Sequence, residues 1–210
     1  TALQIMQFGV PLVYKNDNYS IGITPIIQYG SLDINYDTNT SAAGTTGAGV
    51  SDDISMGYNI GFSYEMGDLT IGAVYKSQID MKYAGQLPTA MAGFGITGYT
   101  NEELSTPAEI GVGFSYNMGV HTIAVDYKQI QWEDAKGYKD FGWEDQNVIA
   151  VGYEYATKQW AARLGYSKAN SAIKDNTGKT LPQAGVGLNA TMANVFNTLG
   201  FPGNIEEHYT

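Results

Sequence analysis

The chain has 210 residues, of which 43% are hydrophobic, and a formal net charge of −10. It contains no Cys, which excludes a disulfide scaffold and any Cys-based metal site. The acidic balance argues against binding of nucleic acid, which requires a basic patch or stripe. No run of about 20 apolar residues is present, so the sequence predicts no transmembrane helix.

Apolar and polar residues alternate with a period of two along most of the chain, and this pattern predicts about eight antiparallel β-strands. Most of them exceed the 5–6 residues that are usual for strands in soluble proteins. The expected strands, in chain order, are 7–14, 19–30, 54–65, 69–83, 110–117, 122–128, 149–155 and 160–167. Pro25 lies within the second of them and cannot donate a ladder hydrogen bond, so it is a candidate for a local break.

The longest alternating stretch is LTIGAVYKSQIDMKY at 69–83. Its odd positions are apolar or aromatic except Ser77, and every charge lies at an even position. Successive side chains of a strand point to opposite faces. We therefore expect one face of this strand to meet lipid along its whole length, with Tyr75 and Tyr83 toward the outer half. The even face would meet a lumen.

The connections between the expected strands alternate in length. Short links lie at 15–18, 66–68, 117–120 and 156–159, and long ones at 37–52, 84–104, 134–145 and about 169–206. This alternation is typical of an outer-membrane barrel, which has short periplasmic turns and long extracellular loops. A soluble sandwich or a lipocalin-type barrel is the alternative, since alternation alone does not exclude it.

Strand length and aromatic placement favour the membrane barrel. A tilted strand needs about 9–11 residues to cross a bilayer. Tyr and Trp near the short turns would form the aromatic girdle of such a barrel: Tyr14, Tyr19, Tyr64, Tyr116, Tyr155 and Trp160. We therefore predict an all-β transmembrane antiparallel β-barrel in the bacterial outer membrane. It would be monomeric and would contact outer-membrane lipid and lipopolysaccharide.

Residues 1–210 are expected to form part of a barrel and not a whole one. In hydrocarbon every backbone polar group must be paired, so a free sheet edge is not tolerated. The last ten residues, FPGNIEEHYT, have the composition of a run-in to a further strand. The expectation is an internal segment of a larger barrel.

Seven charged residues share the positions that face the lumen. They are Lys76, Asp80, Lys82, Asp126, Lys128, Glu154 and Arg163. One interpretation is a structural network of ion pairs that lines the barrel. The other is that some of the cations hold the head group of an anionic amphiphile.

Two long connections are unusually apolar for exposed segments. The first contains Leu87, Met91, Phe94, Ile96 and Tyr99, and the second contains Met192, Val195, Phe196 and Leu199 at helical spacing. Exposed apolar patches usually mark a binding site. The two loops could equally pack on each other as a lid, and a groove between them would still suit a hydrophobic ligand.

The sequence gives little indication of catalysis. The two histidines, His121 and His208, lie at a short turn and near the chain end, without a carboxylate placed for a triad or a metal site. We therefore expect no enzymatic activity, no cofactor and no metal.

Several segments resemble one known family. YKSQIDMKYAG (75–85), LSTPAEIGVGFSYNM (104–118), DYKQIQW (126–132) and FGWEDQNVIAVGYEY (141–155) followed by WAARLGYSKANS (160–171) are similar to FadL/TodX-type outer-membrane transporters. The match covers about 53–173, with a weaker one before it. The resemblance implies a barrel of about fourteen strands with an N-terminal hatch, and neither the hatch nor the final strands occur in this sequence.

The resemblance also implies a function. Members of the family take up long-chain fatty acids or aromatic hydrocarbons, which bind at an extracellular groove and leave sideways through a kinked strand. The expected function is passive uptake of hydrophobic small molecules, with the two apolar loops as the capture site. A general porin for small hydrophilic solutes and an adhesive or structural surface barrel are the alternatives.

Overall fold

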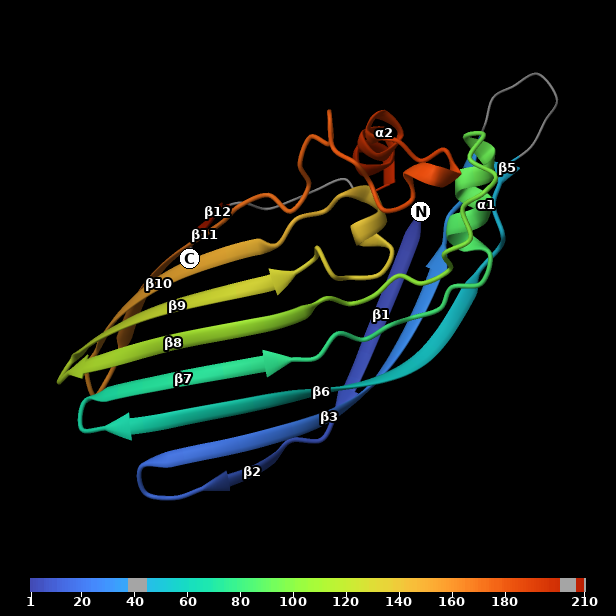
Figure 1. Cartoon of the computed structure of the whole chain (residues 1–210). Helices are drawn as coiled ribbons and strands as arrows, with labels where there is room; N and C mark the ends of the chain where they lie inside the picture. The colour runs from blue at the N-terminus through green and yellow to red at the C-terminus, as the bar shows by residue number, and fades with distance from the viewer. Residues whose placement is uncertain (38–44, 201–206, 210) are drawn as a thin grey trace.

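The computed structural model describes residues 1–37, 45–200 and 207–209, and the fold is dominated by one antiparallel sheet (Figure 1). This sheet has ten strands in the order β1-β3-β6-β7-β8-β9-β10-β11-β12, with β2 also paired to β3. Its strands are β1 (Ala2–Gly9), β2 (Leu12–Lys15), β3 (Tyr19–Asp33), β6 (Ser51–Met66), β7 (Leu69–Lys76), β8 (Ala108–Met118), β9 (His121–Gln131), β10 (Gln146–Ala156), β11 (Ala161–Ala169) and β12 (Glu207–Tyr209). The predicted all-β antiparallel fold is confirmed.

The remaining elements lie in the long connections. They are the short pair β4 (Tyr36–Asp37) and β5 (Thr45–Thr46), helices α1 (Gln86–Gly93) and α2 (Ala190–Gly200), and the 3-10 turns η1 (Tyr138–Phe141) and η2 (Ala184–Val186). Figure 1 shows the tight turns at one end of the sheet and both α-helices at the other. We call these the turn end and the loop end. Among the described residues, no helix is both long enough and apolar enough to cross a membrane.

Two of the turns at the turn end are tight because glycine adopts a backbone conformation that other residues disfavour. Gly67 and Gly119 have φ values of 62° and 74°, in the left-handed region where a β-carbon is disfavoured. Each follows Met and allows the chain to reverse within two residues. Strands β6 and β7, and β8 and β9, consequently pair from their first residues after the turn.

One face of the sheet is apolar and exposed, which is the reverse of a soluble protein. Val112 is 50% exposed and Met56 is 73% exposed, although both lie in the middle of long strands. The exposed apolar residues of this outer face include Ile21, Ile23, Ile27, Ile54, Phe62, Ile71, Ile110, Phe114, Tyr127, Ile149, Val151 and Leu164. An apolar patch of this extent requires an apolar partner. The alternate strand residues that were predicted to face lipid are the ones found on this outer face.

The first expected strand forms two strands in one register. Gly9 lies opposite Ile26 and Leu12 lies opposite Ile23, so no residue is gained or lost between β1 and β2. Pro11 and Pro25 lie in the interval, and neither has a backbone N–H to donate. Strand β3 nevertheless runs unbroken through Pro25, which stays opposite Tyr58 of β6. The interruption lies in the partner strand, between β1 and β2, and not at Pro25 itself.

The expectation for the strand at 69–83 is wrong in its second half. Strand β7 ends at Lys76, and the apolar residues that follow are buried: Ile79 is 2% exposed, Met81 0% and Tyr83 1%. These three side chains do not meet lipid. They belong to an apolar cluster inside the curve of the sheet, together with Ile26, Leu32, Leu104 and Tyr138.

The chain after β7 stays paired with the chain before β8, but the pair leaves the sheet. Ile79 bridges Thr106 and Lys82 bridges Glu103, in the same register in which Lys76 pairs with Glu109. We call residues 77–83 and 102–106 the inner ribbon. Figure 1 shows it as two plain segments that run from the ends of β7 and β8 toward α1.

The inner ribbon lies against the inner face of β3 and β6. A β-carbon at Gly57 would lie 2.5 Å from Cγ1 of Ile79, and one at Gly30 would clash with the Tyr83 hydroxyl. On the other segment of the ribbon, the Thr106 hydroxyl lies 3.0 Å from the Gln28 side-chain amide nitrogen of β3, from which it accepts. It lies 3.2 Å from the Gln28 side-chain oxygen, to which it donates. The two glycines therefore leave the space that the ribbon fills.

Candidate functional site

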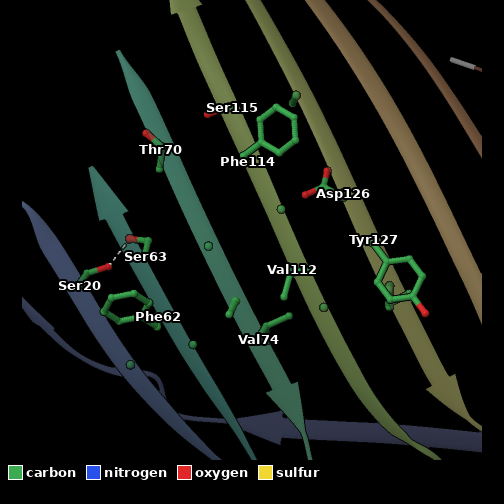
Figure 2. A pocket seen from close by; sticks show the side chains of 18 of the residues that line it. Ser20, Phe62, Ser63, Thr70, Val74, Val112, Phe114, Ser115, Asp126 and Tyr127 are labelled. Atoms are coloured by element: carbon green, nitrogen blue, oxygen red, sulfur yellow. Dashed lines mark hydrogen bonds between the residues drawn. The ribbon is translucent and has the colours of Figure 1, made fainter. Parts of the chain in front are cut away.

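A groove with a volume of about 630 Å³ lies on the inner face of the sheet, across β3, β6, β7, β8 and β9. Figure 2 shows its residues on neighbouring strands, with Ser20, Ser63, Thr70, Ser115 and Asp126 labelled. The Ser20 and Ser63 hydroxyl oxygens lie 2.8 Å apart and bridge β3 to β6. The groove is therefore part of the barrel interior.

The groove is hollow because its wall carries few large side chains. Gly22 lies opposite Gly61, and Gly72 lies opposite Gly113, so two cross-strand pairs, offset by two residues from each other, have no side chains. No heavy atom lies within 4 Å of a β-carbon built at Gly61, and only a backbone oxygen, at 3.6 Å, lies near one at Gly72. Small residues therefore determine the volume of the groove.

A chain of charges borders the groove toward the loop end. Glu109 accepts from two lysines, with Lys76 Nζ at 3.3 Å from one carboxylate oxygen and Lys128 Nζ at 3.4 Å from the other. Asp126 has no ion pair among the described residues, and its carboxylate occupies the space above Gly113. Both lysines remain close to half exposed and keep donors for another group.

The other predicted lumenal charges lie away from the groove and are also paired. Arg163 contacts Glu154 at 2.5 Å across β10 and β11, and Lys82 contacts Glu102 at 3.2 Å within the inner ribbon. Asp80 accepts from Lys136 at 2.9 Å and from Ser105 at 2.7 Å. Six of the seven predicted residues thus take part in ion pairs, as the structural-network interpretation expects.

The inner ribbon separates the groove from the loop end. On β6 the groove reaches residues 61–63, and the ribbon lies above Gly57, further toward the loops. Beside the ribbon, Trp132, Tyr138 and Trp143 pack with ring centroids 4.7–4.9 Å apart. In this structure the ribbon and the three rings form a plug across the inner face.

The two apolar loops pack on each other above this plug. Leu87, Met91, Ile96 and Tyr99 are buried with Phe141, Leu181 and Leu188, and Met192 and Phe196 pack against them. The rings of Phe94 and Phe196 meet edge to face with centroids 4.6 Å apart. We call 84–101, 138–143 and 181–198 the loop layer. The lid interpretation is the arrangement observed, with Val195 at the exposed rim.

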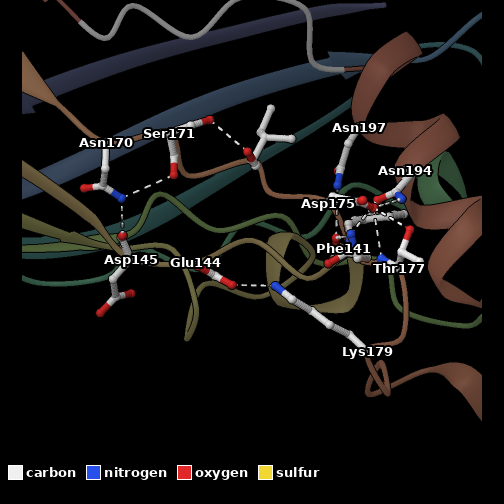
Figure 3. Close-up of polar contacts among 12 residues, drawn as sticks. Phe141, Glu144, Asp145, Asn170, Ser171, Asp175, Thr177, Lys179, Asn194 and Asn197 are labelled. Carbon is white, nitrogen blue, oxygen red and sulfur yellow. Dashed lines mark hydrogen bonds and ion pairs between the residues drawn. The ribbon is translucent and has the colours of Figure 1, made fainter.

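Polar contacts fasten the loop layer (Figure 3). The Asn197 side-chain amide donates to the Phe141 carbonyl at 3.1 Å, and the Asn176 amide donates to the same carbonyl at 2.8 Å. Lys179 forms an ion pair with Glu144. The backbone carbonyl of Phe141 is consequently satisfied although its side chain is buried.

Asp140 joins two long segments through hydrogen bonds: it lies between β9 and β10, and its partners lie between β7 and β8. It is 2% exposed and accepts from the Tyr99 hydroxyl at 2.7 Å and from the Asn101 amide at 2.8 Å. Burial and the nearby Asp140 carboxylate raise the pKa of Tyr99, so its hydroxyl stays protonated and remains a donor.

We expect Asp140→Ala to lower the free energy of unfolding of the loop layer by about 1–3 kcal/mol, because the Tyr99 hydroxyl would be left buried without an acceptor. Hydrogen exchange of the backbone amides of 86–99 measures this local opening. Asp134→Ala, at an exposed carboxylate of the same connection, is the control. Equal exchange in both variants would contradict the assignment.

Sequence patterns did not identify several residues that shape this site. Helix α2 confirms the helical spacing at Met192, Val195 and Phe196, whereas the side chain of Leu199 lies outside the described residues. Glu109, Gly30, Gly57 and the ring cluster of Trp132 were not anticipated. Their roles depend on which strands are neighbours, and a single strand's alternation carries no such information.

Solved structures similar to this chain include two toluene transporters and a mutant monoaromatic hydrocarbon channel. The chain has 15% identity and a TM-score of 0.55 to the Pseudomonas putida toluene transporter TodX, covering 80% of this chain and 55% of that one. The Ralstonia pickettii toluene transporter TbuX is also 15% identical, with a TM-score of 0.55, and the match covers 80% of this chain and 56% of that one. A deltaS2S3 mutant of the TodX monoaromatic hydrocarbon channel is 13% identical, with a TM-score of 0.63, and the match covers 99% of this chain and 60% of that one.

The chain spans less than two thirds of the length of each of these proteins. At such identities the likeness establishes the fold alone. A comparison with curated proteins found no match. A family model described as outer membrane protein transport protein (OMPP1/FadL/TodX) matches residues 1–184, and the chain therefore belongs to this family of bacterial outer-membrane proteins.

Proposed function

We propose that this protein is a passive channel for hydrophobic compounds in the outer membrane, and that passage involves no chemical step. The observation that carries the proposal is the stacking of an apolar loop layer, an inner ribbon and a hollow groove along one inner face. The related structures are named as toluene and monoaromatic hydrocarbon transporters, which supports this substrate class. Aromatic hydrocarbons and long-chain fatty acids are the candidate substrates.

In this proposal the loop layer captures the ligand. The rings of Phe94 and Phe196 meet edge to face and are only partly buried, so an apolar molecule can replace part of their mutual contact. The groove below offers a small-residue surface, and Lys76 and Lys128 stand beside it to contact a polar head group. Lys82 and Arg163 are more distant lumenal contacts. The outer face meets lipid and lipopolysaccharide, and the protein acts as a single barrel.

Phe196→Asp is the test of the capture site. A carboxylate at this position adds charge to an apolar contact surface, so binding of labelled toluene or of a labelled fatty acid is expected to weaken roughly tenfold, or about 1.4 kcal/mol. Phe94→Asp should behave in the same way. Thr191→Asp places the same charge on an exposed position of α2 and serves as the control. Unchanged binding by both Phe variants would exclude the loop layer as the capture site.

A general porin for hydrophilic solutes is the second candidate, because the groove also carries Ser20, Ser63, Thr70 and Asp126. The two functions differ in conductance. A porin gives a steady ohmic ion current in planar bilayers, whereas a barrel plugged by the inner ribbon and the loop layer gives little. Large conductance together with absent toluene binding would favour the porin.

A further inference from the structure

We propose that the inner ribbon is a gate with two docking positions. In the closed position, which the structure shows, it lies over Gly30 and Gly57 across the inner face. In the open position it would lie in the barrel wall, as a continuation of β7 along the edge of β6. The existence of the gate is argued from the register of the strands. Which compounds it controls rests on the proposed function.

The first argument is that β6 has room for the ribbon. Strand β6 pairs with β3 from Ser51 onward, but its ladder with β7 ends at Asn59 opposite Lys76. One further backbone bond continues that ladder, from Ser77 N–H to the Tyr58 carbonyl at 2.9 Å. Within the described part of the chain, residues 51–57 have no strand partner on this edge. A wall strand with one unpaired edge can accept another strand.

The second argument is that side chains now occupy positions where a continued ladder would place backbone groups. Extending the register of β6 and β7 places Ser77 opposite Tyr58 and Lys82 opposite Asp53. The Tyr58 N–H donates to the Ser77 hydroxyl at 3.0 Å, and the Lys82 N–H donates to the Asp53 carboxylate at 2.7 Å. The ribbon has therefore moved inward while keeping the partners that the wall position would give it.

The third argument is that the ribbon's side chains suit both positions. Ile79, Met81 and Tyr83 continue the apolar parity of β7, so in the wall they would face lipid. In the closed position the same face packs on the glycines of β3 and β6. The alternate residues Gln78, Asp80 and Lys82 face the interior in either position. One alternating sequence is thus compatible with two packings.

The fourth argument is that the closed position is not fully satisfied. The Tyr83 hydroxyl and the Trp132 indole N–H are buried without a hydrogen-bond partner in the described part of the chain. Each buried unpaired donor makes the closed state less favourable. Against this, Lys136 bridges Asp80 and Glu103 at 2.9 and 3.0 Å and holds the ribbon inward. Opposing contributions of this kind give a two-state element with a small free-energy difference.

The chain has no native Cys, so engineered disulfides can trap each position. For the closed trap, Gly57→Cys is combined with Ile79→Cys, since Cγ1 of Ile79 lies 2.5 Å from a β-carbon at position 57. For the open trap, Ser55→Cys is combined with Asp80→Cys, which the extended register places opposite each other. Ser51→Cys with Asp80→Cys is out of register by four residues and should not cross-link.

The protein is tested in liposomes for uptake of labelled toluene and in planar bilayers for KCl conductance, each with oxidised and reduced protein. We expect both traps to cross-link. Oxidation of the closed trap should abolish most uptake and conductance, and oxidation of the open trap should raise both. Asn117→Cys with Thr122→Cys links β8 to β9 near the turn end and should change neither.

The outcomes separate the gate from the proposed function. Failure of the open trap to cross-link, or equal uptake and conductance by oxidised and reduced closed trap, would overturn the gate. If both traps form and change the conductance in opposite directions while no variant takes up toluene, the gate stands and the hydrocarbon channel is wrong. Gly30→Ala, which crowds Tyr83, should raise conductance without any cross-link, whereas Gly152→Ala should not.

Discussion

Replacing Gly61 with Phe is expected to reduce uptake of a hydrophobic compound roughly tenfold, equivalent to about 1.4 kcal/mol, without lowering the stability of the barrel. Gly61 lines the groove, and no heavy atom lies within 4 Å of a β-carbon at this position. The ring would therefore enter the groove and fill it without a clash at the β-carbon. Aromatic residues are also more favourable than glycine in strands.

The control for this experiment is another glycine on the inner face. Gly152 of β10 also has open space above it but does not line the groove. Gly152→Phe should leave uptake near the original level while adding the same ring to the barrel interior. Equal losses in the two variants would show that any bulk inside the barrel blocks passage. If both variants kept the uptake of the original protein, the groove would not be part of the path of the hydrophobic compound.

Val112→Arg is expected to lower the free energy of unfolding in liposomes by about 2–4 kcal/mol, the cost of Arg on the lipid face at mid-depth in a barrel. Val112 is half exposed and lies near the middle of β8 on the outer face. On an outer face that meets lipid, a guanidinium at this position would be desolvated. Urea titration of the refolded protein measures the difference.

Ser115→Arg is the matched variant for this measurement. It lies three residues further along β8 and faces the groove, where water and Asp126 can solvate the charge. We expect its stability to remain within about 0.5 kcal/mol of the original protein, as for surface substitutions. A similar cost for both substitutions would mean that the apolar outer face does not meet lipid.

Alternation within single strands predicted the strands and their faces, and strand length, aromatic placement and the alternating lengths of the connections predicted the barrel. The stretch at 110–117 matches β8 within two residues, and its apolar residues Ile110, Val112 and Phe114 are on the exposed face as expected. Period two is a local property, because it follows from the geometry of one strand. The tight turns were predictable for the same reason, since Gly67 and Gly119 act within their own turns.

The path of the inner ribbon was not predictable from the same pattern. The alternation continues from Tyr75 to Tyr83 with Ser77 as its one exception, although the chain leaves the sheet after Lys76. The cause lies on other strands, in Gly30 and Gly57, which leave space on the inner face. The loop layer is similar. The helical spacing of α2 predicts an apolar face, but its burial depends on 84–101 folding against it.

The short wall at β7 has a consequence for the bilayer around the protein. Eight residues of β7 at about 3.3 Å each span about 26 Å along the strand, or about 20 Å of height at the usual tilt near 40°. An apolar band is usually about 25 Å tall, so lipid beside β7 would have to thin locally to match it. Residues 77–83 would restore the missing height if they joined the wall. Hydrophobic mismatch therefore links membrane thickness to the position of the ribbon, with thicker bilayers favouring the taller wall.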